Sequence, residues 1–245
     1  MRKITLSIFL LTFLFSTLMF AQNKRVKMQE GSISYTIKMA GADEMAQIVN
    51  NSVMNLYLKN KHSRIDFSVM GGLATFQLID NDQDDWMTVL MDIPSFYEKT
   101  AINLDADTKF FRRFHRVKTT NQSPTKGLQI EYFKSVRKRI ANFPCYKAVV
   151  KLSNKESVVL YLTDRIKPEE ATELQKPFGD LQGFPLAAEM LVDGVMVKVE
   201  AQRIQRQKIH LDAFEIPESY SHKSMEEFLE DLQKQMGADT GAVGL

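Results

Sequence analysis

The chain has 245 residues, with 32 Lys and Arg against 30 Asp and Glu, a formal net charge of +2 and 44% hydrophobic residues. A chain of this length can bury a hydrophobic core without disulfides. Its single cysteine, Cys145, excludes an intramolecular disulfide and a zinc site built from several thiolates.

The first 21 residues have the layout of a secretory signal peptide. Arg2 and Lys3 are followed by an uncharged run at 4–20, rich in Leu, Ile and Phe, and Ala21 offers a small residue for cleavage. The run is slightly short for a membrane span, so an uncleaved anchor is the less favoured alternative. No cysteine follows the run to carry a lipid. We therefore expect an exported protein, periplasmic or secreted, that is not a lipoprotein.

Alternating apolar and polar residues predict strands along most of the remaining chain. The clearest pattern is 31–39, where Ile33, Tyr35, Ile37 and Met39 share one face, and 42–51 is a short helix or loop. Turns are predicted at Asn60-Lys61, at Gly71-Gly72 and, as the best hairpin, at Asp193-Gly194. The other predicted strands are 54–59, 64–69, 74–79, 86–91, 96–102, 128–133, 146–152, 157–163, 186–192, 195–204 and 207–214.

Two segments have a helical period instead. Residues 105–118 place Phe110, Phe111, Phe114 and Val117 opposite basic residues, which predicts a basic amphipathic helix or an adaptable lid. Ser224 and Glu227 form a capping-box pattern that opens a second helix. Its apolar stripe is Met225, Phe228, Leu229, Leu232 and Met236. We expect one β-rich domain at 22–236 and a flexible tail at 237–245.

Positive charge is concentrated in the middle of the chain. Residues 109–151 hold twelve Lys or Arg and one acid, Glu131, while 80–107 and 212–239 each hold eight acids. Such a stretch can bind phosphates of lipid head groups or glycans, but a solvated strand face that blocks edge aggregation is the general alternative. The candidate ligand-binding residues are Phe110, Phe111, Phe114, Arg112, Arg113, Arg116, Arg137, Lys138 and Arg139.

The sequence offers no motif for catalysis, for a metal ion or for a cofactor. Asp80, Asp82 and Asp84 match the first ligands of a calcium loop, but Asp85 and Met91 stand where that loop needs glycine and glutamate. The four histidines are scattered, and no nucleophile elbow or phosphate-binding glycine loop occurs. Cys145 lies in an apolar strand, which favours a buried, inert thiol. Carboxylates that meet only in three dimensions keep a hydrolase as a third hypothesis.

Several short motifs carry a family resemblance. Their order along the chain is specific to the family, although each motif by itself is not. In this order they resemble a family of uncharacterised exported bacterial proteins, domain of unknown function 4412, over most of 31–220. The motifs are GSISY at 31–35, YLKN at 57–60, SRID at 63–66, FPCYKAV at 143–149, FPL at 184–186 and FEIPESY at 214–220.

That family is similar, more remotely, to the lipoprotein carriers typified by LolA and LolB. The resemblance implies a strongly curved antiparallel sheet, an incomplete barrel with helices over its open side and an apolar concave face that takes up acyl chains. It assigns no ligand contact to a numbered residue.

From these observations we predict a mainly β (α+β) protein whose curved antiparallel sheet forms an incomplete barrel with one or two covering helices. The leading hypothesis is an exported cell-envelope binding protein for a lipid, lipoprotein or other apolar ligand, without catalysis or cofactor, with basic residues orienting the ligand at the mouth. The alternative is an interaction or structural protein with a filled core that docks an envelope protein through its charged faces. Peripheral membrane contact fits either hypothesis, and nucleic acid fits neither.

Overall fold

The computed structural model describes residues 27–41, 43–80, 86–93, 99–105, 128–152, 157–172, 174–178, 181–192 and 194–231. Within them, twelve strands form one sheet in the order β12-β6-β5-β4-β3-β2-β1-β11-β10-β9-β8-β7. The strands are β1 Gly31–Met39, β2 Val53–Lys59, β3 His62–Val69, β4 Ala74–Asp80, β5 Trp86–Asp92, β6 Thr100–Asp105, β7 Gln129–Ile140, β8 Phe143–Lys151, β9 Ser157–Thr163, β10 Phe184–Val192, β11 Val195–Gln205 and β12 Ser221–Lys223.

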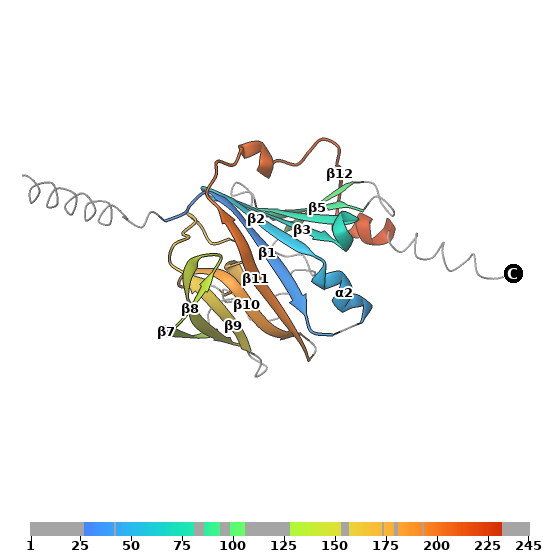
Figure 1. The fold of residues 1–245 in the computed structure, drawn as a ribbon. Coiled ribbons are helices and arrows are strands. Elements are labelled where there is room, and N and C mark those ends of the chain that lie inside the picture. The colour runs from blue at the N-terminus through green and yellow to red at the C-terminus, as the bar shows by residue number, and fades with distance from the viewer. Residues whose placement is uncertain are drawn as a thin grey trace, which may run out of the picture.

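The sheet is strongly curved and does not close (Figure 1). Strands β7 and β12 end the order on opposite sides, and β1 and β11 lie between the two halves. This arrangement confirms the predicted fold class, a mainly β incomplete barrel. One pairing was not predicted: β12 runs parallel to β6, whereas the other neighbours are antiparallel.

Two short α-helices accompany the sheet in the described chain. Helix α2 (Glu44–Asn50) packs against β1, and its first turn is capped by Asp43, whose Oδ1 accepts a hydrogen bond from the Ala46 amide at 2.7 Å. The second helix, at 225–231, has the predicted capping box: the Ser224 amide donates to Glu227 at 2.7 Å and the Glu227 amide donates to Ser224 Oγ at 3.1 Å. The rest of its predicted stripe, Leu232 and Met236, lies outside the described residues.

Most predicted strands are confirmed within a few residues, but 207–214 is not a strand. This segment leaves β11 as extended chain and ends in the 3-10 helix η3 (Leu211–Phe214). The apolar residues of this segment are buried without strand pairing: Ile209 and Phe214 pack on Ile79, Leu90 and Ala101 of the sheet. The segment 206–220 therefore crosses one face as a strap between β11 and β12, visible at the top of Figure 1.

Two charged residues, Arg64 on β3 and Glu30 just before β1, hold the strap in place. Arg64 forms a two-pronged ion pair with Asp66, at 2.6 and 2.8 Å, and donates a third hydrogen bond to the Ala213 carbonyl at 2.7 Å. Glu30 accepts a hydrogen bond from the Ile209 amide at 2.8 Å, and this bond lowers the pKa of Glu30 more than any other interaction. The strap is thus bound through its backbone as well as through its two buried apolar side chains.

Gly31, the first residue of β1, is a position where only glycine fits. Its φ is +143°, and a Cβ there would lie 2.2 Å from the Gln205 carbonyl oxygen of β11. A backbone atom in a paired strand cannot move aside without disturbing the β1–β11 ladder.

Substituting Gly31→Ala is therefore expected to lower the free energy of unfolding by about 3 kcal/mol or more, through the clash as well as the backbone strain. The matched control is Gly71→Ala, because Gly71 also has a positive φ, +68°, but has no atom within 4 Å of the added methyl group. The control is expected to lose only about 1 kcal/mol. Urea unfolding of both variants measures the difference, and equal losses would show that the contact with β11 is unimportant.

Candidate functional site

The candidate site is an apolar face that the pairing register builds across the first half of the sheet. Directly paired residues of successive antiparallel strands lie side by side on one face. One such line is wholly aliphatic and crosses six strands: Ile33, Leu56, Ile65, Leu78, Val89 and Ile102. The next line on the same face contains Met54, Phe67, Phe76 and Met91, on β2, β3, β4 and β5, which we call the apolar row.

Burial differs between these two neighbouring lines. In the aliphatic line, Ile33, Leu56, Ile65 and Ile102 are buried, with at most 7% exposure. Leu78 and Val89 of that line are half-buried. All four members of the apolar row are only half-buried, although its flanking neighbours, Tyr35 and Thr100, are buried. Four large side chains, two Phe and two Met, therefore remain accessible side by side. Methionine is unbranched and polarizable, so it adapts to ligands of irregular shape.

The opposite face of the same strands carries a polar line across β1 to β4, next to the apolar residues that pack against the strap. The corresponding line there contains Ser34, Asn55, Asp66 and Gln77, and Ser34 Oγ donates to Asn55 Oδ1 at 2.7 Å. Since successive side chains of a strand point to opposite faces, this alternation assigns one side of β1–β4 to solvent and the strap, and the other to apolar contacts.

The residues predicted to bind a ligand fall into two groups. Arg137, Lys138 and Arg139 lie on β7 and are exposed. Lys138 donates to Glu200 at 2.5 Å, and this hydrogen bond is the main cause of its raised pKa. The second group lies outside the described residues, as do the signal peptide and most of the predicted lid at 105–118. The members of this group are Phe110, Phe111, Phe114, Arg112, Arg113 and Arg116.

Lys138 and the apolar row are not brought together. Glu200, its partner, pairs with Thr36 of β1, and Thr36 points to the face opposite Tyr35 and the apolar row. Any orienting role of Lys138 would therefore act on the other side of the sheet.

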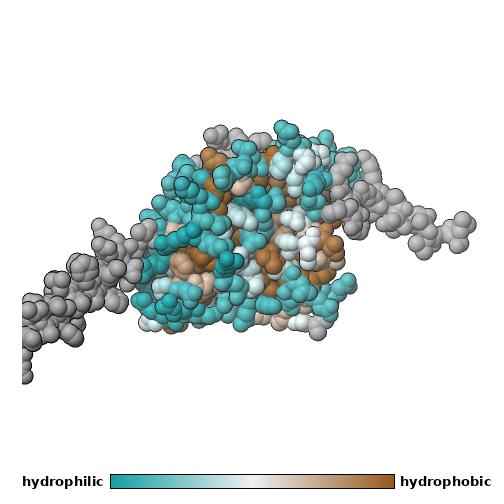
Figure 2. All heavy atoms as spheres, turned by 45° about the horizontal axis from the view of Figure 1, so that its top comes forward, coloured by the Kyte–Doolittle hydropathy of each residue, from teal (hydrophilic) through white to brown (hydrophobic). Residues whose placement is uncertain are grey.

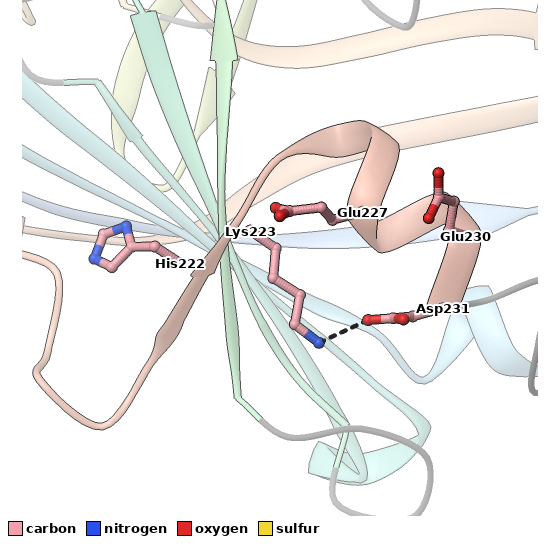
Figure 3. Close-up of a pocket in the computed structure, with 5 residues that line it drawn as sticks. All are labelled: His222, Lys223, Glu227, Glu230 and Asp231. Carbon is pink, nitrogen blue, oxygen red and sulfur yellow. Dashed lines mark hydrogen bonds and ion pairs between the residues drawn. The ribbon is translucent and has the colours of Figure 1, made fainter.

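A polar cleft of about 340 Å³ lies between β12 and the helix at 225–231. Figure 3 shows Lys223 reaching from β12 to Asp231, with a separation of 3.0 Å, while His222 points away from the helix. Glu227 is already used by the capping box. Among the residues that line the cleft, the Lys223–Asp231 ion pair therefore joins the helix to β12.

The described part of the chain contains no group of three or more His, Cys, Asp or Glu residues placed to hold a metal ion. In that same part, no helix is long and apolar enough to cross a membrane. Figure 2 shows a mostly hydrophilic surface with separate apolar patches. The exposed large apolar residues of the described chain are Val53, Met70, Leu73, Phe133, Val136, Leu191, Val192, Leu211 and Leu229.

Cys145 is buried, as predicted, with 2% of its surface exposed. Its thiol donates a hydrogen bond to the Phe143 carbonyl at 3.5 Å, and burial raises its pKa from 9.0 to about 11. Because the reactive species is the thiolate, both burial and the raised pKa suppress its chemistry.

Thiol labelling tests this placement. At mildly alkaline pH the thiolate fraction of Cys145 is expected to be about a hundredfold lower than that of a thiol with an ordinary pKa. The native protein should thus react with iodoacetamide at least that much more slowly than the urea-unfolded chain. Raising the pH toward the pKa of the folded thiol should narrow the gap. Equal rates in the two states would contradict a buried thiol.

The apolar row was not predicted as a site from the sequence. Each strand's alternation was visible, but the row depends on which residues of β2, β3, β4 and β5 pair, and that register is set in three dimensions. Turn lengths supply the only signal: the tight turn at Asn60-Lys61, where Asn60 has a positive φ of 53°, fixes the β2–β3 register that puts Met54 opposite Phe67.

No family model and no curated protein matches the chain, so its place in the domain-of-unknown-function family stays a prediction. The chain is similar to several solved structures. One is the Pseudomonas aeruginosa MucA/MucB complex, with 10% identity and a TM-score of 0.43, where the match covers 78% of this chain and 57% of that chain. An uncharacterised conserved protein from Thermus thermophilus has 10% identity and a TM-score of 0.45, covering 80% of this chain and 91% of the other. The Mycobacterium tuberculosis lipoprotein LppX has 8% identity and a TM-score of 0.36, covering 75% and 90%.

Proposed function

We propose that the protein is an exported cell-envelope binding protein for a lipid, lipoprotein or other apolar ligand, and that it works without catalysis or a cofactor. The observation that carries this proposal is the partly exposed apolar row on β2–β5. Export is supported by the signal-peptide pattern of the first 21 residues.

The row alone would bind weakly. Covering the exposed part of four large apolar side chains contributes roughly 1 kcal/mol each, or about 4 kcal/mol together. That free energy corresponds to a dissociation constant of about 1 mM. A ligand must therefore contribute apolar surface of its own, which a long acyl chain does and a small polar solute does not.

A docking function for a protein partner is the second candidate. It is supported by the acidic surface of the helix at 225–231, where Glu226 and Glu230 are exposed and Asp231 forms an ion pair with Lys223. Charge of this kind directs association with a basic partner more than it provides affinity. Docking of a protein partner requires no bound lipid, so a measurement of lipid bound to the purified protein separates the two candidates.

Native mass spectrometry tests the lipid proposal on the expected mature form, 22–245, produced in a bacterial periplasm. We expect a bound species of lipid mass, recovered by organic extraction, or saturable binding when palmitate is offered to the delipidated protein. The paired variant Phe67→Thr, Phe76→Thr removes two adjacent rings of the row and is expected to weaken palmitate binding about tenfold or more.

The matched control is Val53→Thr, because Val53 is exposed and precedes Met54 on β2 but points to the opposite face. It should bind as the parent does, and urea unfolding of each variant verifies that the fold persists. A protein that carries no lipid and ignores palmitate would contradict the carrier function and favour partner docking.

A further inference from the structure

The outer strand β7 presents an unusual surface. It is last in the strand order and pairs with β8, and seven consecutive residues, 133–139, are exposed. They include four cations and two apolar side chains, Phe133 at 39% exposure and Val136 at 46%.

A large bulge projects the middle of this strand outward. Phe133 pairs with Lys147 and Arg137 with Tyr146, so three residues of β7 lie between two pairs that are consecutive on β8. Bulges of this kind break the ladder and turn side chains away from the neighbouring strand. Lys134 and Val136 both belong to the projecting segment.

Some of the cations on β7 and β8 have a carboxylate partner, and others have none in the described chain. Lys138 is paired with Glu200, and Lys151 with Glu131. Lys134 and Lys147 each lie 5.9 Å from an uncharged ring, those of Tyr146 and Phe133, and Arg139 donates to the Asn142 carbonyl at 2.9 Å. We call the remaining cations of β7 together with one cation of β8 the basic edge: Lys134, Arg137, Arg139 and Lys147. Within the described chain, no carboxylate forms an ion pair with any of these four.

We propose that the basic edge, with Phe133 and Val136, docks the protein onto the surface of an anionic lipid bilayer. The cations match lipid phosphates in charge, and two apolar side chains among them match the acyl layer just beneath. Cations and a bulge on an outer strand also prevent strand pairing between molecules. That role gives no reason to expose Phe133 and Val136, whereas a bilayer uses both kinds of side chain.

This surface is separate from the apolar row, and docking does not depend on the proposed ligand binding.

Docking is measured by sedimentation with two kinds of vesicle, one of phosphatidylcholine and phosphatidylglycerol and one of phosphatidylcholine alone. We expect 22–245 to bind the anionic vesicles and not the neutral ones, with binding that falls as salt is raised. The variant Lys134→Gln, Arg137→Gln, Arg139→Gln should lose about a hundredfold in partitioning, roughly fivefold per cation.

The control removes equal charge elsewhere, through Lys167→Gln, Arg203→Gln and Lys208→Gln, all at exposed positions. It should retain most of the binding. The pair Phe133→Ser, Val136→Ser should weaken binding about tenfold and leave the salt dependence unchanged. Equal binding to neutral vesicles, or equal losses in the two charge variants, would overturn the proposal. So would binding to polyglutamate without binding to vesicles, since that points to an acidic protein.

Discussion

The pairing register of β1–β6 is the constraint on which the rest of this structure depends. It aligns six aliphatic residues, from Ile33 to Ile102, in one line, four of them buried, and places the apolar row directly beside it. A slip of one residue in any pair would exchange the two faces of that strand. Such a slip would bring Asp66 or Gln77 into the core, and a slip of β3 would break the hydrogen bond from Arg64 to Ala213 that holds the strap. The two faces therefore stabilise one register together, one by apolar burial and the other by ion pairs and backbone hydrogen bonds.

Local patterns were sufficient to predict most of the fold. The alternation of 31–39, the turn residues at 60–61 and the capping box at Ser224 each encode an element through its immediate neighbours in the chain, and each is present. Residues 207–214 of the strap were wrongly predicted as a strand, because an alternation of apolar and polar residues does not reveal whether the chain pairs with a sheet or only crosses it. The parallel β12–β6 pair joins residues about 120 positions apart, and a three-residue strand carries too short a pattern to predict.

The candidate site was harder to predict than the fold, for a physical reason. The sequence directed attention to runs of like residues, such as the aromatic and basic residues at 109–139, because runs are visible along one chain. The apolar row consists of one residue from each of four strands and becomes a surface only through pairing. The basic residues of β7 were visible as a run, yet their environment was not: Lys138 is neutralised by Glu200 of β11, whereas Arg137 and Arg139 are not paired with any described carboxylate.

Photo-crosslinking with a diazirine-bearing fatty acid would test the central claim most directly. The protein, 22–245, would be labelled at low occupancy, digested and mapped by mass spectrometry. An apolar ligand on the proposed face predicts labels at Met54, Phe67, Phe76 or Met91, suppressed by excess palmitate and absent from the adjacent Val53 on the opposite face. Labels spread evenly over both faces, or none that palmitate suppresses, would contradict the assignment of this face as the ligand site.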